Sequence, residues 1–168
     1  MIGGDERVVE QLRPIFVALA PAPDKGWARL GPAGAGHFAK MVHNGIEYGM
    51  MQALAEGFAV LEHKQEFQID LARTASVWQH GSVVRSWLLD LTAEALAENP
   101  SLDGIAPFVE DSGEGRWMVM ESLTSGVPCP VTTAALTERI RSRTINSFGN
   151  RLLSVMRNKF GGHSMKTQ

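Results

Sequence analysis

Five polar residues between positions 40 and 48 have a spacing that would bring them together on a helix. At 100° per residue, one helical face carries Lys40, His43, Asn44 and Glu47, with Tyr48 at its edge. Lys40 and Glu47 are seven residues apart, which is roughly 10 Å along a helix axis. A sugar-sized molecule would fit alongside, and His43 and Asn44 can hydrogen-bond its hydroxyl or carboxylate groups. The alternative is a solvated helix face with an ordinary i,i+4 pair between His43 and Glu47.

The opposite face of the same segment is apolar and contains small residues. It carries Phe38, Val42, Gly45 and Gly49. A glycine inside a helix costs about 1 kcal/mol relative to alanine, so two of them need a reason such as the close approach of another backbone. The pattern predicts a buried, tightly packed helix from near Ala35 to about His63, which would form the central axis of an all-α domain.

The start of the chain predicts a short strand and a helix. Residues 1–5 have the pattern of a strand end, a turn and a helix N-cap at Asp5. A helix should follow from Val8 to Leu19, with a kink or a short start at Pro14 because proline cannot donate a backbone hydrogen bond.

The remainder of the chain predicts more helices. Apolar periodicity and breakers indicate them over 68–78, 83–96 and 116–123. A last helix, capped by Thr132 or Thr133, is predicted to carry the arginines from Arg139 to Arg157. The tryptophans at 78, 87 and 117 are expected in the core.

Residues 34–57 resemble the signature segment of decarboxylating 6-phosphogluconate dehydrogenases, in the form GAGHFAKMVHNGIEYGMMQALAEG. Three further segments fit the same family in order: GSVVRSW at 81–87, DSGEGRW at 111–117 and RNKFGGH at 157–163. The similarity covers nearly the whole chain and is closest in form to the short bacterial branch. It implies the all-α C-terminal domain of that family, built around one long central helix.

The resemblance implies acid and base roles for two residues. Lys40 matches the general base that takes the proton from the substrate 3-hydroxyl as hydride leaves for the nicotinamide, so its amine must start neutral. Glu47 matches the acid that protonates C1 of the enediol after carbon dioxide has left. The implied reaction converts 6-phosphogluconate to ribulose 5-phosphate with reduction of NAD or NADP, a step of the pentose phosphate pathway.

The resemblance also implies which residues hold the two ends of the substrate. His43 and Asn44 would hold the sugar acid, and Tyr48 would touch the phosphate. The remaining residues implied at the phosphate are Arg116, Arg139, Arg157 and His163. In larger members the last two positions reach the phosphate from the partner subunit, and a dianionic phosphate favours such convergent cations. Met118 is a departure, because larger members have a phosphate-contacting threonine there.

Two regions follow from this comparison. Residues 1–30 are interpreted as a remnant of the end of the nucleotide-binding domain with its connection, and residues 31–168 as the all-helical substrate-binding and catalytic domain. No G-x-G-x-x-G motif follows a strand, and no β-α-β alternation is predicted. NAD or NADP would therefore be bound mainly by a domain absent from this chain. The chain alone is expected to be inactive.

Composition argues against several other classes. The net charge is −2 without a basic stripe, which argues against nucleic-acid binding, and no apolar run of about 20 residues predicts a membrane span. Cys129 is the single cysteine, so no internal disulfide is possible and a cytoplasmic location is expected. His43 and Glu47 alone do not make a metal site, and none is expected. The family resemblance implies a homodimer or higher homo-oligomer.

Two alternatives remain open at this point. One is a non-catalytic helical binding or oligomerisation module derived from such an enzyme. The other is a related β-hydroxyacid dehydrogenase, which the cluster of residues implied at the phosphate argues against.

Overall fold

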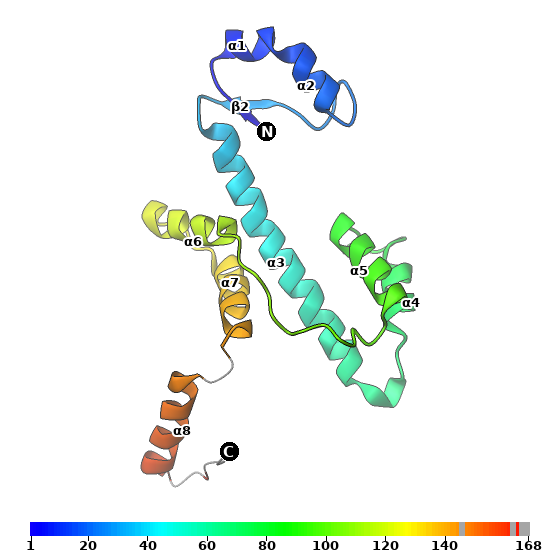
Figure 1. The fold of residues 1–168 in the computed structure, drawn as a ribbon, viewed down its shortest axis with the longest axis vertical. Helices are drawn as coiled ribbons and strands as arrows, with labels where there is room; N and C mark the ends of the chain where they lie inside the picture. The colour runs from blue at the N-terminus through cyan, green and yellow to red at the C-terminus, as the bar shows by residue number, and fades with distance from the viewer. Residues whose placement is uncertain (145–146, 162–163, 165–168) are drawn as a thin grey trace.

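The computed structural model describes residues 1–144, 147–161 and 164, and its elements are almost all helices. Figure 1 shows one long helix, α3 (Ala35–His63), with the other elements arranged along it. At 1.5 Å per residue, its 29 residues span about 43 Å. The predicted all-α fold class and the predicted bounds of this central helix are both confirmed.

An N-terminal unit adjoins the start of α3. It comprises β1 (Ile2–Gly3), α1 (Glu6–Gln11), α2 (Arg13–Leu19) and β2 (Arg29–Gly31). Asp5 caps α1 by accepting hydrogen bonds from the backbone of Arg7 and Val8. Pro14 lies in the first turn of α2, so the predicted kink is a break between two helices. The strands pair in parallel, which makes one β-α-β crossover where none was predicted.

Two glycines allow α3 to begin tightly against β1. Gly34 precedes the helix with a φ of 93°, a left-handed conformation that side chains rarely adopt. A Cβ atom on Gly36 would lie 2.8 Å from the backbone oxygen of Met1 and 2.9 Å from the backbone nitrogen of Gly3. Gly34 before the helix and Gly36 in its first turn therefore permit the close approach of α3 to β1.

Two helices pack on the C-terminal half of α3, after the short 3₁₀ turn η1 (Gln65–Phe67). They are α4 (Leu71–Trp78) and α5 (Trp87–Glu98). Both begin later than predicted, because capping side chains fix their first turns. Asp70 accepts from the backbone N–H of Arg73, and Ser86 accepts from that of Leu89.

A hydrophobic core joins these three helices. Its buried members are Phe58, Ala75, Leu89, Ala93 and Leu96. The Trp78 ring packs here, with its centroid 5.5 Å from that of Phe58. Trp87 is 80 % exposed and Trp117 is 54 % exposed, so the expectation that the tryptophans are core residues was wrong for these two.

Another pair of helices, α6 (Glu114–Ser125) and α7 (Pro130–Ser142), packs against the central part of α3 (Figure 1). A Cβ atom on Gly45 would overlap the Met118 side chain, and one on Gly49 would lie 3.1 Å from Val131. The close approach that these glycines predicted is present, with side chains as the neighbours in place of a backbone. Phe38, expected on the same buried face, is half-exposed.

The single last helix predicted from Thr132 or Thr133 was wrong. The structure has two helices there, α7 and α8 (Phe148–Gly161). Proline suits the first position of a helix, so α7 starts at Pro130, and Thr132 is buried and donates to the backbone oxygen of Gly45 at 3.3 Å. Figure 1 shows α8 standing apart from the other helices. Within the described residues, none of the helices has the length and apolar character needed to cross a membrane.

Candidate active site

The polar face of α3 forms a linked set of side chains. Lys40 Nζ donates to Asn44 Oδ1 at 2.6 Å and lies 3.1 Å from His43 Nδ1. His43 Nδ1 is 3.1 Å from Asn44 Oδ1 and 3.9 Å from Glu47 Oε2. Lys40 and His43 are exposed, so this face is open to a ligand. The helix therefore brings the four residues together as their spacing predicted.

Tyr48 lies where this polar face meets the protein interior. Its side chain packs against Ala135 and Leu136 of α7, and the residue is only 5 % exposed. The hydroxyl donates to Asp111 Oδ1 at 3.1 Å and lies 3.5 Å from Ser112 Oγ. Because Asp111 receives the hydroxyl hydrogen, Tyr48 could donate to a phosphate only after that bond had broken.

Asp111 is a buried carboxylate with three hydrogen-bond donors. Its side chain is 0 % exposed, and Oδ2 accepts from Arg116 Nη2 at 2.5 Å. Oδ1 accepts from the backbone N–H of Gly113 at 3.0 Å as well as from Tyr48. Burial raises the pKa of Asp111, but the hydrogen bonds from Gly113, Tyr48 and Arg116 outweigh it and hold the pKa below its ordinary value. At neutral pH the group is therefore a charged anchor for Arg116.

Arg139 reaches the same place from α7. Its guanidinium carbon lies 3.5 Å from the centroid of the Tyr48 ring, a cation–π arrangement. Nη1 donates to the backbone oxygen of Glu110 at 2.9 Å, and Nη2 lies 3.5 Å from Met51 Sδ. Arg139 therefore contacts the Tyr48 ring, while Tyr48 and Arg116 both bond the Asp111 carboxylate. We call Tyr48, Asp111, Arg116 and Arg139 the arginine cluster.

The start of α6 connects the arginine cluster to the polar face of α3. The Ser112 hydroxyl donates a short hydrogen bond to Glu114 Oε2, which lowers the pKa of Glu114. Helix α6 packs along α3, and Tyr48, which directly follows Glu47 on α3, bonds Asp111 in the segment before α6. The predicted proton-transfer residues and the predicted phosphate residues therefore adjoin each other along α3.

Two other residues predicted at the phosphate are not part of the cluster. Arg157 is exposed on α8, away from α3 in Figure 1. His163 lies outside the described residues. Within the described part of one chain, the predicted phosphate residues that meet are Tyr48, Arg116 and Arg139.

Sequence reasoning missed two residues of this surface, Asp111 and Glu114. The signal was available, because both belong to the DSGEGRW segment that carries part of the family resemblance. Met118, the departure noted there, packs against Gly45 of α3. No group of three or more His, Cys, Asp or Glu side chains among the described residues is arranged to hold a metal ion.

Comparison with known proteins decides the family. The family model for the C-terminal domain of 6-phosphogluconate dehydrogenase matches residues 36–154. The chain belongs to this family. The Bacillus subtilis protein YqeC, which carries this family name provisionally, is 46 % identical to the chain. The similarity covers 98 % of this chain and 54 % of YqeC. The NAD-dependent decarboxylating enzyme of Haloferax volcanii is 41 % identical over 98 % of this chain and 55 % of its own length.

A solved structure shows the same fold. The 6-phosphogluconate dehydrogenase of Plasmodium falciparum, described in its apo form and in complex with NADP+ and with 6-phosphogluconate, has a TM-score of 0.75 to this chain. The two are 27 % identical, over 99 % of this chain and 36 % of that one. The chain spans about half the length of the two curated relatives named above.

Proposed function

We propose that this chain supplies the substrate-binding and catalytic residues of a decarboxylating 6-phosphogluconate dehydrogenase. In this proposal the enzyme is cytoplasmic, belongs to the pentose phosphate pathway and forms ribulose 5-phosphate with reduction of NAD or NADP. The observation that carries the proposal is the continuity of two groups. The polar face with Lys40 and Glu47 adjoins the cluster with Arg116 and Arg139, because Tyr48 directly follows Glu47 on α3 and contacts both Asp111 and Arg139.

The contacts of Lys40 suit a general base. A neutral amine has two hydrogens and one lone pair, and two acceptors, Asn44 Oδ1 at 2.6 Å and His43 Nδ1 at 3.1 Å, are within reach of those hydrogens. The lone pair is then free to take the proton of a substrate hydroxyl. This arrangement requires the His43 tautomer that carries its hydrogen on Nε2. His43 and Asn44 thus orient the amine in addition to contacting the sugar acid.

Glu47 is the acid in this proposal. It lies on the same face as Lys40, about 10 Å along the axis of α3. The two side chains lean toward each other, since His43 Nδ1 is 3.1 Å from Lys40 Nζ and 3.9 Å from Glu47 Oε2. They can therefore serve neighbouring carbons of a six-carbon acid, with Lys40 at the 3-hydroxyl and Glu47 at C2, which becomes C1 of the enediol once the carboxyl carbon has left. After carbon dioxide has left, a protonated Glu47 donates its proton to C1 of the enediol.

The arginine cluster supports recognition of a phosphate. Arg116 has a half-exposed side chain and uses one of its N–H donors on Asp111, which leaves others for a ligand. Arg139 adds a second fixed cation, held on the ring of Tyr48, whose hydroxyl bonds the same Asp111. One guanidinium group can bond two phosphate oxygens at once. Two such groups therefore favour a phosphorylated sugar acid over an unphosphorylated one.

The described residues do not fit a bound nicotinamide dinucleotide. Their sheet has only the strands β1 and β2, whereas a dinucleotide fold uses several parallel strands with a glycine-rich turn after the first. In this proposal NAD or NADP is bound mainly outside the described residues. The proton transfers assigned to Lys40 and Glu47 use groups of this chain alone.

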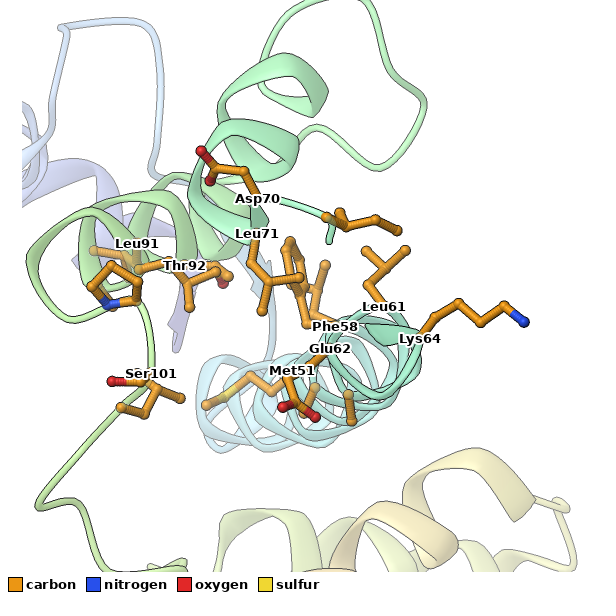
Figure 2. A pocket seen from close by; sticks show the side chains of 18 of the residues that line it. Met51, Phe58, Leu61, Glu62, Lys64, Asp70, Leu71, Leu91, Thr92 and Ser101 are labelled. Atoms are coloured by element: carbon orange, nitrogen blue, oxygen red, sulfur yellow. The ribbon is translucent and has the colours of Figure 1, made fainter. Parts of the chain in front are cut away.

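An apolar groove supports the homodimer part of the proposal. Figure 2 shows Phe58, Leu61 and Leu71 side by side in it. Helices α3, α4 and α5 form this hollow of about 1000 Å³. Three charged residues line it as well: the acidic Glu62 and Asp70 and the basic Lys64, whose amine lies 2.6 Å from Glu66. An apolar surface of this extent marks a contact with another molecule.

The segment we propose as its cover is α8 of a second copy. Its apolar stripe is exposed and comprises Phe148, Leu152, Val155 and Met156. The same helix carries two basic residues within or beside this stripe, Arg151 and Lys159, which complement the acidic residues of the groove. Reciprocal exchange of α8 gives a closed dimer with both apolar surfaces covered.

Ligand binding tests the proposal. Isothermal titration of this chain with 6-phosphogluconate and with gluconate should show the phosphorylated acid binding at least about tenfold more tightly. Equal affinity for both acids would favour a β-hydroxyacid dehydrogenase without phosphate recognition. Absence of binding by either acid would favour a helical binding or oligomerisation module. Turnover is measured in the protein that joins this chain to a nucleotide-binding domain, as NAD or NADP reduction coupled to release of carbon dioxide.

A further inference from the structure

Asp111 occupies a position that none of the roles assigned above uses. Its carboxylate is the meeting point of three parts of the chain: Tyr48 from α3, Gly113 from the loop before α6, and Arg116 from α6 itself. The side chain is 0 % exposed, so a bound sugar acid does not touch it. Its effect on a ligand must therefore pass through the residues that it holds.

Keeping a charged carboxylate out of water is costly unless its oxygens are paired. Both oxygens of Asp111 are paired here, Oδ1 with Tyr48 and Gly113, and Oδ2 with Arg116 at 2.5 Å. The contact with Arg116 is a charge-assisted bond to a planar group, which fixes the direction of the guanidinium as well as its distance. Arg116 would otherwise be a long, half-exposed side chain with several rotamers.

The carboxylate also fixes Arg116 relative to Arg139. Tyr48 is bonded to Asp111 through its hydroxyl and is stacked under Arg139 through its ring. One rigid connection therefore runs from Arg116 through Asp111 and Tyr48 to Arg139. Two guanidinium groups held at a constant separation bind a dianion better than two that must be ordered on binding.

We propose that Asp111 is a positioning residue that sets the preference of this site for phosphorylated over unphosphorylated sugar acids. The proposal rests on the proposed function, because it assigns the arginine cluster to the substrate phosphate. Asp111 contributes through the geometry of Arg116 and Arg139. It opposes phosphate binding through its own negative charge, and the geometric effect is the larger of the two.

The isosteric variant Asp111→Asn tests this balance. An asparagine keeps one oxygen for Tyr48 and Gly113 but presents an amide donor to Arg116, so the guanidinium is released. We expect the dissociation constant for 6-phosphogluconate to rise roughly tenfold and that for gluconate to change less than about twofold. In the protein joined to a nucleotide-binding domain, KM for 6-phosphogluconate should rise while kcat stays nearly constant. A matched control is Glu121→Gln, which removes a negative charge from α6 outside the arginine cluster and should leave both affinities unchanged.

Three outcomes would overturn the inference. Equal or tighter binding of 6-phosphogluconate by Asp111→Asn would mean that the carboxylate only neutralises Arg116. Equal loss for both acids would mean a general structural role. If the wild-type protein bound neither acid, the proposed function would fail and this inference with it. If the wild-type protein bound 6-phosphogluconate selectively and Asp111→Asn kept that selectivity, the role of Asp111 alone would be overturned.

A second variant covers the case in which Asp111→Asn folds poorly. Arg116→Lys keeps the positive charge but lacks the planar fork that Asp111 holds. Positioning predicts a similar selective loss of roughly tenfold for 6-phosphogluconate in this variant. Full retention of selectivity by lysine would mean that charge alone recognises the phosphate, which overturns the role given to Asp111.

Discussion

The guanidinium of Arg139 stacks on the ring of Tyr48, with 3.5 Å between its central carbon and the ring centroid. The two residues come from α7 and α3, and the same arginine bonds the backbone oxygen of Glu110 in the loop before α6. The stack therefore links the central helix to the segment that supplies Asp111 and Arg116.

Replacement of Arg139 by lysine should weaken phosphate recognition. Lysine keeps the charge but cannot stack as a plane while bonding the Glu110 oxygen, so 6-phosphogluconate should bind roughly tenfold more weakly and gluconate nearly as before. Titration calorimetry measures both affinities. The control is Arg141→Lys on the same helix, where the exposed arginine pairs with Glu138 at 3.1 Å and no change is expected. An equal effect of the two substitutions would contradict the assignment of Arg139.

Lys40 and Glu47 should fail at different steps when substituted. Lys40→Met removes the base, so NAD or NADP reduction should be abolished in the protein joined to a nucleotide-binding domain. Glu47→Gln removes only the later acid, so oxidation should remain measurable while protonation of the enediol slows. Rapid-mixing absorbance follows the reduced nicotinamide, and product analysis follows ribulose 5-phosphate. Loss of the same step to the same extent in both variants would show that the division of roles is wrong.

The sequence predicted α3 well because its signals are local. A periodic polar face and small residues at Gly45 and Gly49 fixed its type, and its bounds were also predicted. The grouping of Tyr48, Arg116 and Arg139 could be predicted only through the family resemblance, since they come from three helices.

Other features had no usable local signal. The break between α7 and α8 was missed because the arginines keep a helical spacing through it. The exposure of Trp87 was missed because residue type predicts burial only on average. The DSGEGRW segment pointed to Asp111 only through the family resemblance, because its bond to Tyr48 joins residues 63 positions apart and is not visible in one sequence.

Two glycines in helices should respond oppositely to alanine. A Cβ atom on Gly115 would overlap the Tyr48 ring, which Asp111 and Arg139 hold in place, so Gly115→Ala should cost about 1 to 3 kcal/mol of unfolding free energy. Gly57 in α3 has nothing within 4 Å, so Gly57→Ala should gain about 0.5 to 1 kcal/mol. Urea unfolding followed by circular dichroism measures both. Wild-type stability in Gly115→Ala would contradict the packing described for Tyr48.

Acid stability should depend on Asp111. Its pKa is below the ordinary value of about 3.9 in the folded chain, so the unfolded chain binds more protons there as the pH falls. The stability that Asp111 contributes is complete above that ordinary value and is lost as the pH falls through the folded value. Urea midpoints from about pH 6 to about pH 3 should therefore fall less steeply in Asp111→Asn than in wild type.

A control variant separates the effect of Asp111 from that of Glu114, whose pKa is also lowered. The pKa of Glu114 is lowered by its bond from Ser112, so Glu114→Gln should remove its own part of the acid dependence and leave that of Asp111. Parallel pH curves for Asp111→Asn and wild type would show that the buried carboxylate does not carry the dependence.

The exposed stripe of α8 should control assembly. A 14-residue helix with an unpaired apolar face is marginal alone, so its stability should come from contact with a second chain. Met156→Glu places a charge on that stripe in both copies. Losing about 1.5 kcal/mol of burial per copy should raise the dimer dissociation constant roughly a hundredfold. Asn150→Glu on the opposite face of α8 is the matched control. Sedimentation velocity over a concentration series should show a wild-type dimer, a dimeric Asn150→Glu and a largely monomeric Met156→Glu. A dimer that Met156→Glu leaves intact would mean that a different surface joins the two chains.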